Sequence, residues 1–133
     1  MPDLKRALVV EDDEPMRVLM VQRLEMHGLV VDAAECWIDG KRFLTENRYA
    51  VVVCDNRMPQ RVGELIRNNK GLELLEWVRR GSELNKEVPF IMHSSDEESD
   101  VLPRLTAQSA QFSPKGGRPK YYEMVAELIK NKN

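Results

Sequence analysis

Short apolar segments that alternate with helix-like stretches constrain the fold of this chain more than any other feature. Five segments have the length and composition of strands: residues 7–10, 29–31, 49–54, 88–92 and 110–113. The first and third are almost continuously apolar, which is typical of strands buried on both faces of a parallel sheet. Between the segments, and after the last, apolar residues recur at helical spacing. The pattern predicts an α/β fold, a doubly wound five-stranded parallel sheet with strand order 2-1-3-4-5.

The predicted helices are marked by their apolar stripes and by the residues at their ends. The first opens at Pro15 and stops at Gly28, since proline suits a first helical turn and glycine suits a helix end. The other four are expected around Phe43, around Leu75, within residues 101–107 and around Val125. Pro103 predicts that the fourth helix is short or irregular, because proline removes a helical hydrogen bond.

Length and composition are typical of a single globular domain. The chain has 133 residues, enough for one core, and we expect residues 1–133 to form one domain. It is 42% hydrophobic and 32% charged, which argues against a disordered protein. The formal net charge of −2 does not call for a polyanionic partner, so direct nucleic-acid binding is not expected.

The amino terminus, the apolar runs and the cysteines bear on where the protein works. The longest apolar runs are far too short to span a membrane, and MPDLKR lacks the layout of a secretion signal. Cys36 and Cys54 are far apart and form no CxxC motif, which argues against a disulfide framework or a thiolate metal site. We therefore expect a cytoplasmic protein without membrane association.

Polar residues follow four of the five predicted strands. Glu11 and Asp12 follow the first strand, Asp55 the third, Ser94 the fourth and Lys115 the fifth. In open α/β sheets, ligands bind beyond the carboxyl ends of the strands, where the strand order reverses. With order 2-1-3-4-5 the reversal lies between strands 1 and 3. We therefore expect three carboxylates, a hydroxyl and an ammonium to converge on one rim.

Such a cluster predicts a metal ion and phosphoryl chemistry. Two carboxylates about 4 Å apart repel by roughly 4 kcal/mol at an effective dielectric near 20, so three need a nearby cation to stay ionised. Carboxylate oxygens on an open rim suit Mg²⁺, or Mn²⁺ in its place. Asp55 is then the candidate nucleophile, and Lys115 and the Ser94 hydroxyl are candidates to hold phosphoryl oxygens. The residues thus indicate an aspartyl-phosphate site.

Five segments give the chain a specific resemblance to a known family. They are LVVEDDEPMR, VVVCDNRMP, GLELLEWVRR, PFIMHSS and AQFSPK, spread over nearly the whole chain. With them the sequence resembles the response-regulator receiver domain of two-component signal transduction. The resemblance implies a flavodoxin-like (βα)5 fold. It further implies that Asp12 binds Mg²⁺ directly, that Glu11 acts through water, and that the backbone carbonyl of Arg57 is a further ligand.

The resemblance also implies a function and partners. It makes Asp55 the phosphoacceptor, with a sensor histidine kinase or a histidine phosphotransfer protein as the donor. It makes Ser94 the switch hydroxyl and Phe112 the switch aromatic, which would turn inward after phosphorylation and relay the change to the output face. Lys115 would pair with the phosphoryl group. Such a domain catalyses its own phosphorylation and autodephosphorylation and is not otherwise an enzyme. Its downstream partner would be a separate protein or an output domain outside this chain.

Some features depart from the family pattern. The segment 60–70 is longer than the usual loop and adds Arg61, Arg67 and Lys70 near the rim. Gly116 replaces the proline that usually follows the lysine, which puts the expected cis peptide there in doubt. These departures keep open an alternative, a degenerate receiver that binds a partner without being phosphorylated.

Other interpretations are less favoured by the residues. A flavin-binding redox protein of the same fold needs a hydroxyl- and glycine-rich phosphate loop after the first strand, where this chain has carboxylates. Hydrolysis of external phosphoesters would need a general acid beyond the cluster. His93 is expected to be a structural or surface residue and not the base of a Ser-His pair, because neighbouring residues on a strand point to opposite faces. Ser95 is expected to cap the fourth helix.

Overall fold

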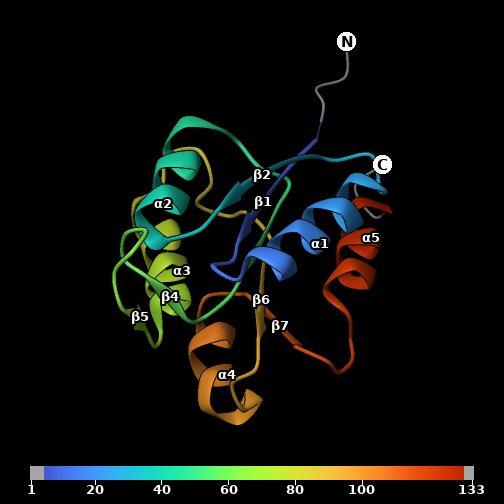
Figure 1. Cartoon of the computed structure of the whole chain (residues 1–133). Coiled ribbons are helices and arrows are strands. Elements are labelled where there is room, and N and C mark those ends of the chain that lie inside the picture. Colours follow the sequence, from blue (N-terminus) through green and yellow to red (C-terminus); the bar gives the residue numbers. More distant parts are fainter. Residues whose placement is uncertain (1–4, 131–133) are drawn as a thin grey trace.

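The computed structural model describes residues 5–130 and contains a five-stranded sheet flanked by five helices (Figure 1). The strand order is β2-β1-β3-β6-β7, and every pairing in this sheet is parallel. Its strands are β1 (Arg6–Val10), β2 (Val30–Ala34), β3 (Val51–Cys54), β6 (Phe90–Ser94) and β7 (Gln111–Pro114). In terms of these five strands the order is 2-1-3-4-5, so the predicted fold class is confirmed.

The central strands are apolar on both faces because helices cover both sides of the sheet. In β1, Leu8 and Val10 face one hydrophobic core, while Ala7 and Val9 face the other. The same alternation runs through β3 and β6, as the two-residue period of a strand requires. The near-continuous apolar runs of the sequence therefore reflect burial on two faces and not a helix.

The helices divide between the two faces. Helices α1 (Glu14–Glu25) and α5 (Tyr121–Lys130) lie side by side on one face, and α2 (Trp37–Glu46) and α3 (Lys70–Gly81) lie on the other (Figure 1). Helix α4 (Glu98–Ala107) packs along β7 at the edge of the sheet. Within the described residues, no helix is long and apolar enough to cross a membrane.

Helix ends mostly follow the predicted signals. Asp13 caps α1 by accepting a hydrogen bond from the Met16 backbone N–H at 3.0 Å, with Pro15 in the first turn. Helix α4 begins earlier than predicted and keeps Pro103 in its interior. The prediction that Ser95 caps α4 is wrong. The N-cap is Glu97, whose side chain makes no capping hydrogen bond, and Ser95 is exposed before it.

The long segment before α3 forms a small antiparallel hairpin in place of a loop. Strands β4 (Met58–Pro59) and β5 (Ile66–Arg67) pair with each other and leave the main sheet untouched (Figure 1). We call residues 58–69 the inserted hairpin. Met58 and Pro59 are buried at its base, whereas residues 61–69 are all exposed.

Candidate functional site

Strand register brings the predicted rim together. Val10 pairs with Cys54, so the next residues, Glu11 and Asp55, leave the sheet at the same level. The Asp55 backbone N–H donates to the Val10 carbonyl oxygen at 2.9 Å. On the other side, the Lys115 backbone N–H donates to the carbonyl oxygen of Ser94 at 2.9 Å. The sheet therefore aligns four of the five predicted rim residues, and Asp12 follows Glu11 directly.

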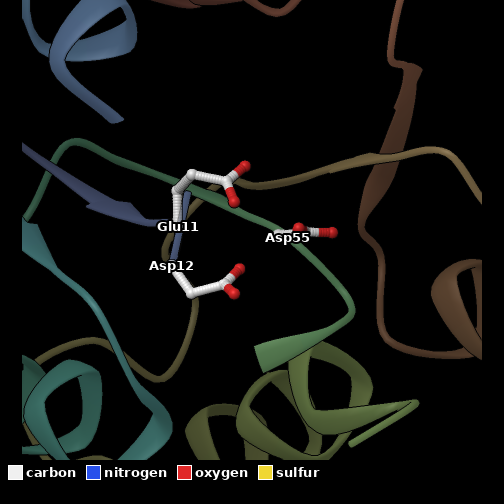
Figure 2. A group of neighbouring side chains, drawn as sticks. All are labelled: Glu11, Asp12 and Asp55. Carbon is white, nitrogen blue, oxygen red and sulfur yellow. The ribbon is translucent and has the colours of Figure 1, made fainter. Parts of the chain in front are cut away.

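Three carboxylates meet at this rim. Glu11, Asp12 and Asp55 each offer an oxygen within 4.8 Å of the others, and their side chains point into one shared space (Figure 2). Glu11 is fully buried and Asp55 is 5% exposed, whereas Asp12 is half-buried at the mouth. The predicted acidic cluster is thus present, with Asp12 its most accessible member.

The charge state of the cluster reflects this crowding. Burial, and after it the negative charge of Asp55, raises the pKa of Glu11 to about 7. A buried carboxyl that resists ionisation beside another carboxylate indicates a place where a cation would relieve the repulsion. The oxygen-only donor set fits a hard divalent ion such as Mg²⁺. Asp12, Asp55 and the backbone carbonyl of Arg57 would hold it, with Glu11 acting through water.

Lys115 is the positive counterpart of the cluster. Its Nζ donates a hydrogen bond to Asp55 Oδ2 at 2.9 Å. The same Nζ lies 2.9 Å from Glu11 Oε1, in an ion pair without hydrogen-bond geometry. Burial alone would lower the pKa of the ammonium, but Asp55 and Glu11 outweigh it, and the pKa of Lys115 is raised. Lys115 therefore stays protonated and can form an ion pair with an added anion.

The backbone around Asp55 holds the carboxylate rigidly. Its Oδ1 accepts hydrogen bonds from the backbone N–H groups of Asn56 at 2.7 Å and of Arg57 at 3.3 Å. Helix α3 starts so close to this turn that a Cβ on Gly71 would fall on the Asp55 carbonyl oxygen. The carboxylate is thus oriented before any ligand arrives, which favours transfer chemistry.

The two residues predicted to relay the signal, Ser94 and Phe112, are both buried, and each already has contacts of its own. Ser94 is fully buried, and its hydroxyl donates to Asp96 Oδ2 at 2.8 Å. Phe112 is 8% exposed and already belongs to the core on the α2 and α3 face. The inward turn expected of this aromatic ring is therefore not needed to bury it.

His93 and Gly116 lie next to the rim residues Ser94 and Lys115. His93 is buried against the Tyr121 ring, with ring centroids 4.7 Å apart, and burial followed by Lys115 lowers its pKa to about 4. Of the two predicted roles, structural or surface, the structural one is therefore correct. Gly116 adopts a positive φ of 76°, and the cis peptide bond lies beyond it, at Arg118–Pro119.

Of the three cations predicted to lie near the rim in segment 60–70, Arg61 and Arg67 are exposed, whereas Lys70, the first residue of α3, is only 5% exposed. The Lys70 Nζ pairs with Glu73 at 3.2 Å and lies over the Trp37 ring. Lys70 is therefore a structural residue of the helix start and does not belong to the exposed basic surface near the rim.

Sequence reasoning missed two polar residues of the site. Asn56 is 1% exposed, and its side chain contacts both Asn69 and Asp96. Asp96 in turn binds Ser94. A signal was available, because Asn56 and Asp96 are each the second residue after the end of a strand, β3 and β6, where the other site residues lie.

The family model for the response regulator receiver domain matches residues 7–115. The chain belongs to the response regulator receiver family. The matched region includes every rim residue described above, from Glu11 to Lys115. No functionally curated protein matches the sequence significantly.

Solved receiver structures share the fold over nearly the whole chain. A CheY-like receiver domain protein from Methanospirillum hungatei has a TM-score of 0.75 at 22% identity, covering 98% of this chain and 94% of that one. Chemotaxis response regulator CheY4 of Vibrio cholerae has a TM-score of 0.72 at 20% identity, with coverage of 97% and 98%. A LuxR-family DNA-binding response regulator from Staphylococcus aureus has 0.73 at 23%, with 96% and 98%. At these identities the likeness shows the fold.

Proposed function

We propose that this receiver domain is a phosphorylation-dependent signalling switch whose phosphoacceptor is Asp55. The observation that carries the proposal is the position of Asp55 Oδ2, 2.9 Å from the Lys115 ammonium and within the acidic cluster of Glu11 and Asp12. Membership of the receiver family supports it. The donor is a phosphohistidine on a sensor histidine kinase or a histidine phosphotransfer protein.

The chemistry follows from the residues that surround the carboxylate. An Asp55 oxygen attacks phosphorus, the bond from phosphorus to the donor histidine nitrogen breaks, and the released imidazole takes up a proton from solvent. The Lys115 ammonium is already protonated and hydrogen-bonded to Asp55. It can therefore transfer this hydrogen bond to a phosphoryl oxygen as negative charge develops there. The backbone N–H groups of Asn56 and Arg57 keep the carboxylate oriented. Positioning and charge neutralisation are most of what phosphoryl transfer requires.

Mg²⁺ belongs to this proposal as the cofactor. When bound, it neutralises the carboxylates and the incoming phosphoryl oxygens. Asp12, at the open side of the cluster, would bind it directly, and Asp55 and the backbone carbonyl of Arg57 would be the further protein ligands. Glu11 is held back by its burial and by Lys115, which suits contact through water.

The signal leaves the site through Ser94. A phosphoryl group adds a charge of roughly −1.5 to −2 and new acceptor oxygens beside the buried hydroxyl. Movement of Ser94 toward it alters the packing at the end of β6, where Ser94 pairs with Pro114 of β7, two residues beyond the pair of Met92 and Phe112. Phe112 is already buried, so its part in the relay is a shift within the core near α4. The equilibrium between two conformations of helices α4 and α5, the output face, is thereby shifted.

Intact-mass analysis after incubation with acetyl phosphate tests the proposal. Wild type is expected to gain one phosphoryl group in a Mg²⁺-dependent manner, and Asp55→Asn is expected to gain none. Asp100→Asn, an exposed site on α4, is the matched control and should label like wild type. Hydroxylamine should remove the adduct, as expected of an acyl phosphate.

Two results would contradict the proposal. One is equal labelling of Asp55→Asn and wild type, which would place the acceptor elsewhere. The other is no adduct with acetyl phosphate or with a histidine-phosphorylated donor protein. That second result would make the chain a degenerate receiver that docks partners without modification.

A further inference from the structure

The Ser94 hydroxyl is fully engaged in this structure. Its single proton is donated to Asp96 Oδ2 at 2.8 Å, and its oxygen accepts the Asp96 backbone N–H at 3.0 Å. The side chain is completely buried, so water does not compete for it. A hydroxyl has one proton to donate. While Asp96 accepts that proton, Ser94 has none for an oxygen on Asp55.

Asp96 is itself anchored from the neighbouring strand end. Asn56 Nδ2 donates to Asp96 Oδ2 at 2.9 Å and to Asn69 Oδ1 at 3.0 Å. Asn56 Oδ1 accepts the Leu72 backbone N–H at 3.1 Å, which fixes the amide orientation against α3. Asp96 Oδ2 therefore accepts two hydrogen bonds, one from the buried Asn56 amide and one from the Ser94 hydroxyl. Bonds to a charged acceptor of this kind are stronger than neutral ones.

We infer that Asp96 is a positioning residue that holds the Ser94 hydroxyl in the resting orientation, with Asn56 as its anchor, and competes with the phosphoryl group for it. The inference rests on the proposed function, because it concerns how Ser94 answers a phosphorylated Asp55. One effect opposes the active state. The hydroxyl must break its charge-assisted bond to Asp96 before it can donate to a phosphoryl oxygen on Asp55. Asp96 thus sets how much of the phosphorylated domain reaches the active conformation.

The experiment measures the affinity of the phosphoryl mimic beryllium trifluoride, with Mg²⁺ present, by calorimetry. Asp96→Ala is expected to bind it about tenfold more tightly than wild type, since one bond to a charged acceptor no longer has to break. Asp96→Asn keeps an oxygen that can accept the hydroxyl and should give a smaller gain. Glu97→Gln removes the same charge from an exposed neighbour and should bind like wild type.

A double-mutant cycle separates positioning from simple loss of negative charge. In the Ser94→Ala background, Asp96→Ala should give a gain of less than twofold, because there is no hydroxyl left to release. A tenfold gain in both backgrounds would overturn the inference and leave a charge effect alone. Unchanged affinity in Asp96→Ala, with wild type binding normally, would also overturn it and spare the proposed function. Failure of wild type itself to bind the mimic or accept phosphate would overturn both.

Discussion

The carboxylate rim and the inserted hairpin are adjacent in sequence but opposite in exposure. At the rim, Glu11 and Asp55 are buried, and each oxygen of Asp55 has a donor within 3.3 Å. On the hairpin, residues 61–69 are all exposed, and the apolar side chains of Val62, Leu65 and Ile66 are 62%, 86% and 61% exposed. Burial and hydrogen bonds therefore fix the positions of the rim carboxylates, whereas the hairpin side chains are exposed to solvent.

The difference shows how a receiver can accept extra chain next to its site. Both ends of the hairpin are tied down: Met58 and Pro59 are buried, and Asn69 contacts Asn56. The backbone of Gln60 also accepts a hydrogen bond from Ile38 N–H at 3.1 Å. Everything between these anchors projects away from the core, so the insertion does not disturb the carboxylates.

Substitution of two glycines, one beside the rim and one in the hairpin, should give the largest difference in stability between the two regions. Gly71→Ala should lower the free energy of unfolding by about 4 kcal/mol, because its Cβ would overlap the backbone of Asp55 and Asn56. Gly63→Ala in the hairpin should cost about 1 kcal/mol, since it has open space and only a positive φ of 89° to strain it. Urea unfolding of both variants measures the difference. Equal costs would contradict the rigid-rim description.

The pH dependence of stability tests the packing behind the rim. His93 faces Tyr121, with Lys115, Asp55 and Lys120 as the charged groups nearby. Its pKa is about 4 when folded and ordinarily 6.5, so the unfolded state binds a proton first as pH falls. This share of stability is complete above pH 6.5 and is lost between pH 6.5 and 4.

His93→Phe keeps the ring contact and removes the titration. Between pH 7 and 4.5, wild type should lose about 2.5 kcal/mol more stability than the variant, the linkage value for these two pKa values. Urea unfolding at both pH values gives the comparison, and carboxylate protonation contributes to both proteins alike. Parallel losses in the two proteins would mean that His93 is not held neutral by the fold.

Metal dependence distinguishes the two regions by a smaller effect. At a Mg²⁺ concentration tenfold above its dissociation constant, wild type should gain about 1.4 kcal/mol of stability, by linkage of binding to the folded state. Asp12→Ala should lose most of this gain, while Glu64→Ala on the hairpin should retain it. Thermal unfolding with and without Mg²⁺ measures both. An unchanged gain in Asp12→Ala would remove Asp12 from the metal site.

The smallest effect is expected at the exposed apolar side chains of the hairpin. Leu65→Ser and Ile66→Ser should change the free energy of unfolding by less than about 0.5 kcal/mol, since both side chains are already in water. Labelling by acetyl phosphate should also match wild type. A loss above about 1 kcal/mol at either position would show that these side chains pack against the domain.

Much of this molecule follows from its sequence. The apolar runs and the residues after them predicted the strand order and the meeting of Glu11, Asp12, Asp55 and Lys115. This worked because parallel strands end at one edge, so residues that directly follow them must converge. The limits of β2 and β6 were displaced by one to three residues along the chain, since hydrogen-bond pairing and not hydrophobicity alone decides where a strand ends.

Other features were decided only by the tertiary structure. The hairpin at 58–69 has no regular apolar pattern, and its pairing depends on the anchors at its base. The hydrogen bonds from Ser94 to Asp96 and from Asn56 to Asp96 depend on how side chains are oriented after the ends of two strands. Hydrogen bonds of this kind are chosen among several partners of similar strength, and the choice is made by packing. The sequence therefore determined which groups meet at the rim, and the folded chain determined which of them hold one another at rest.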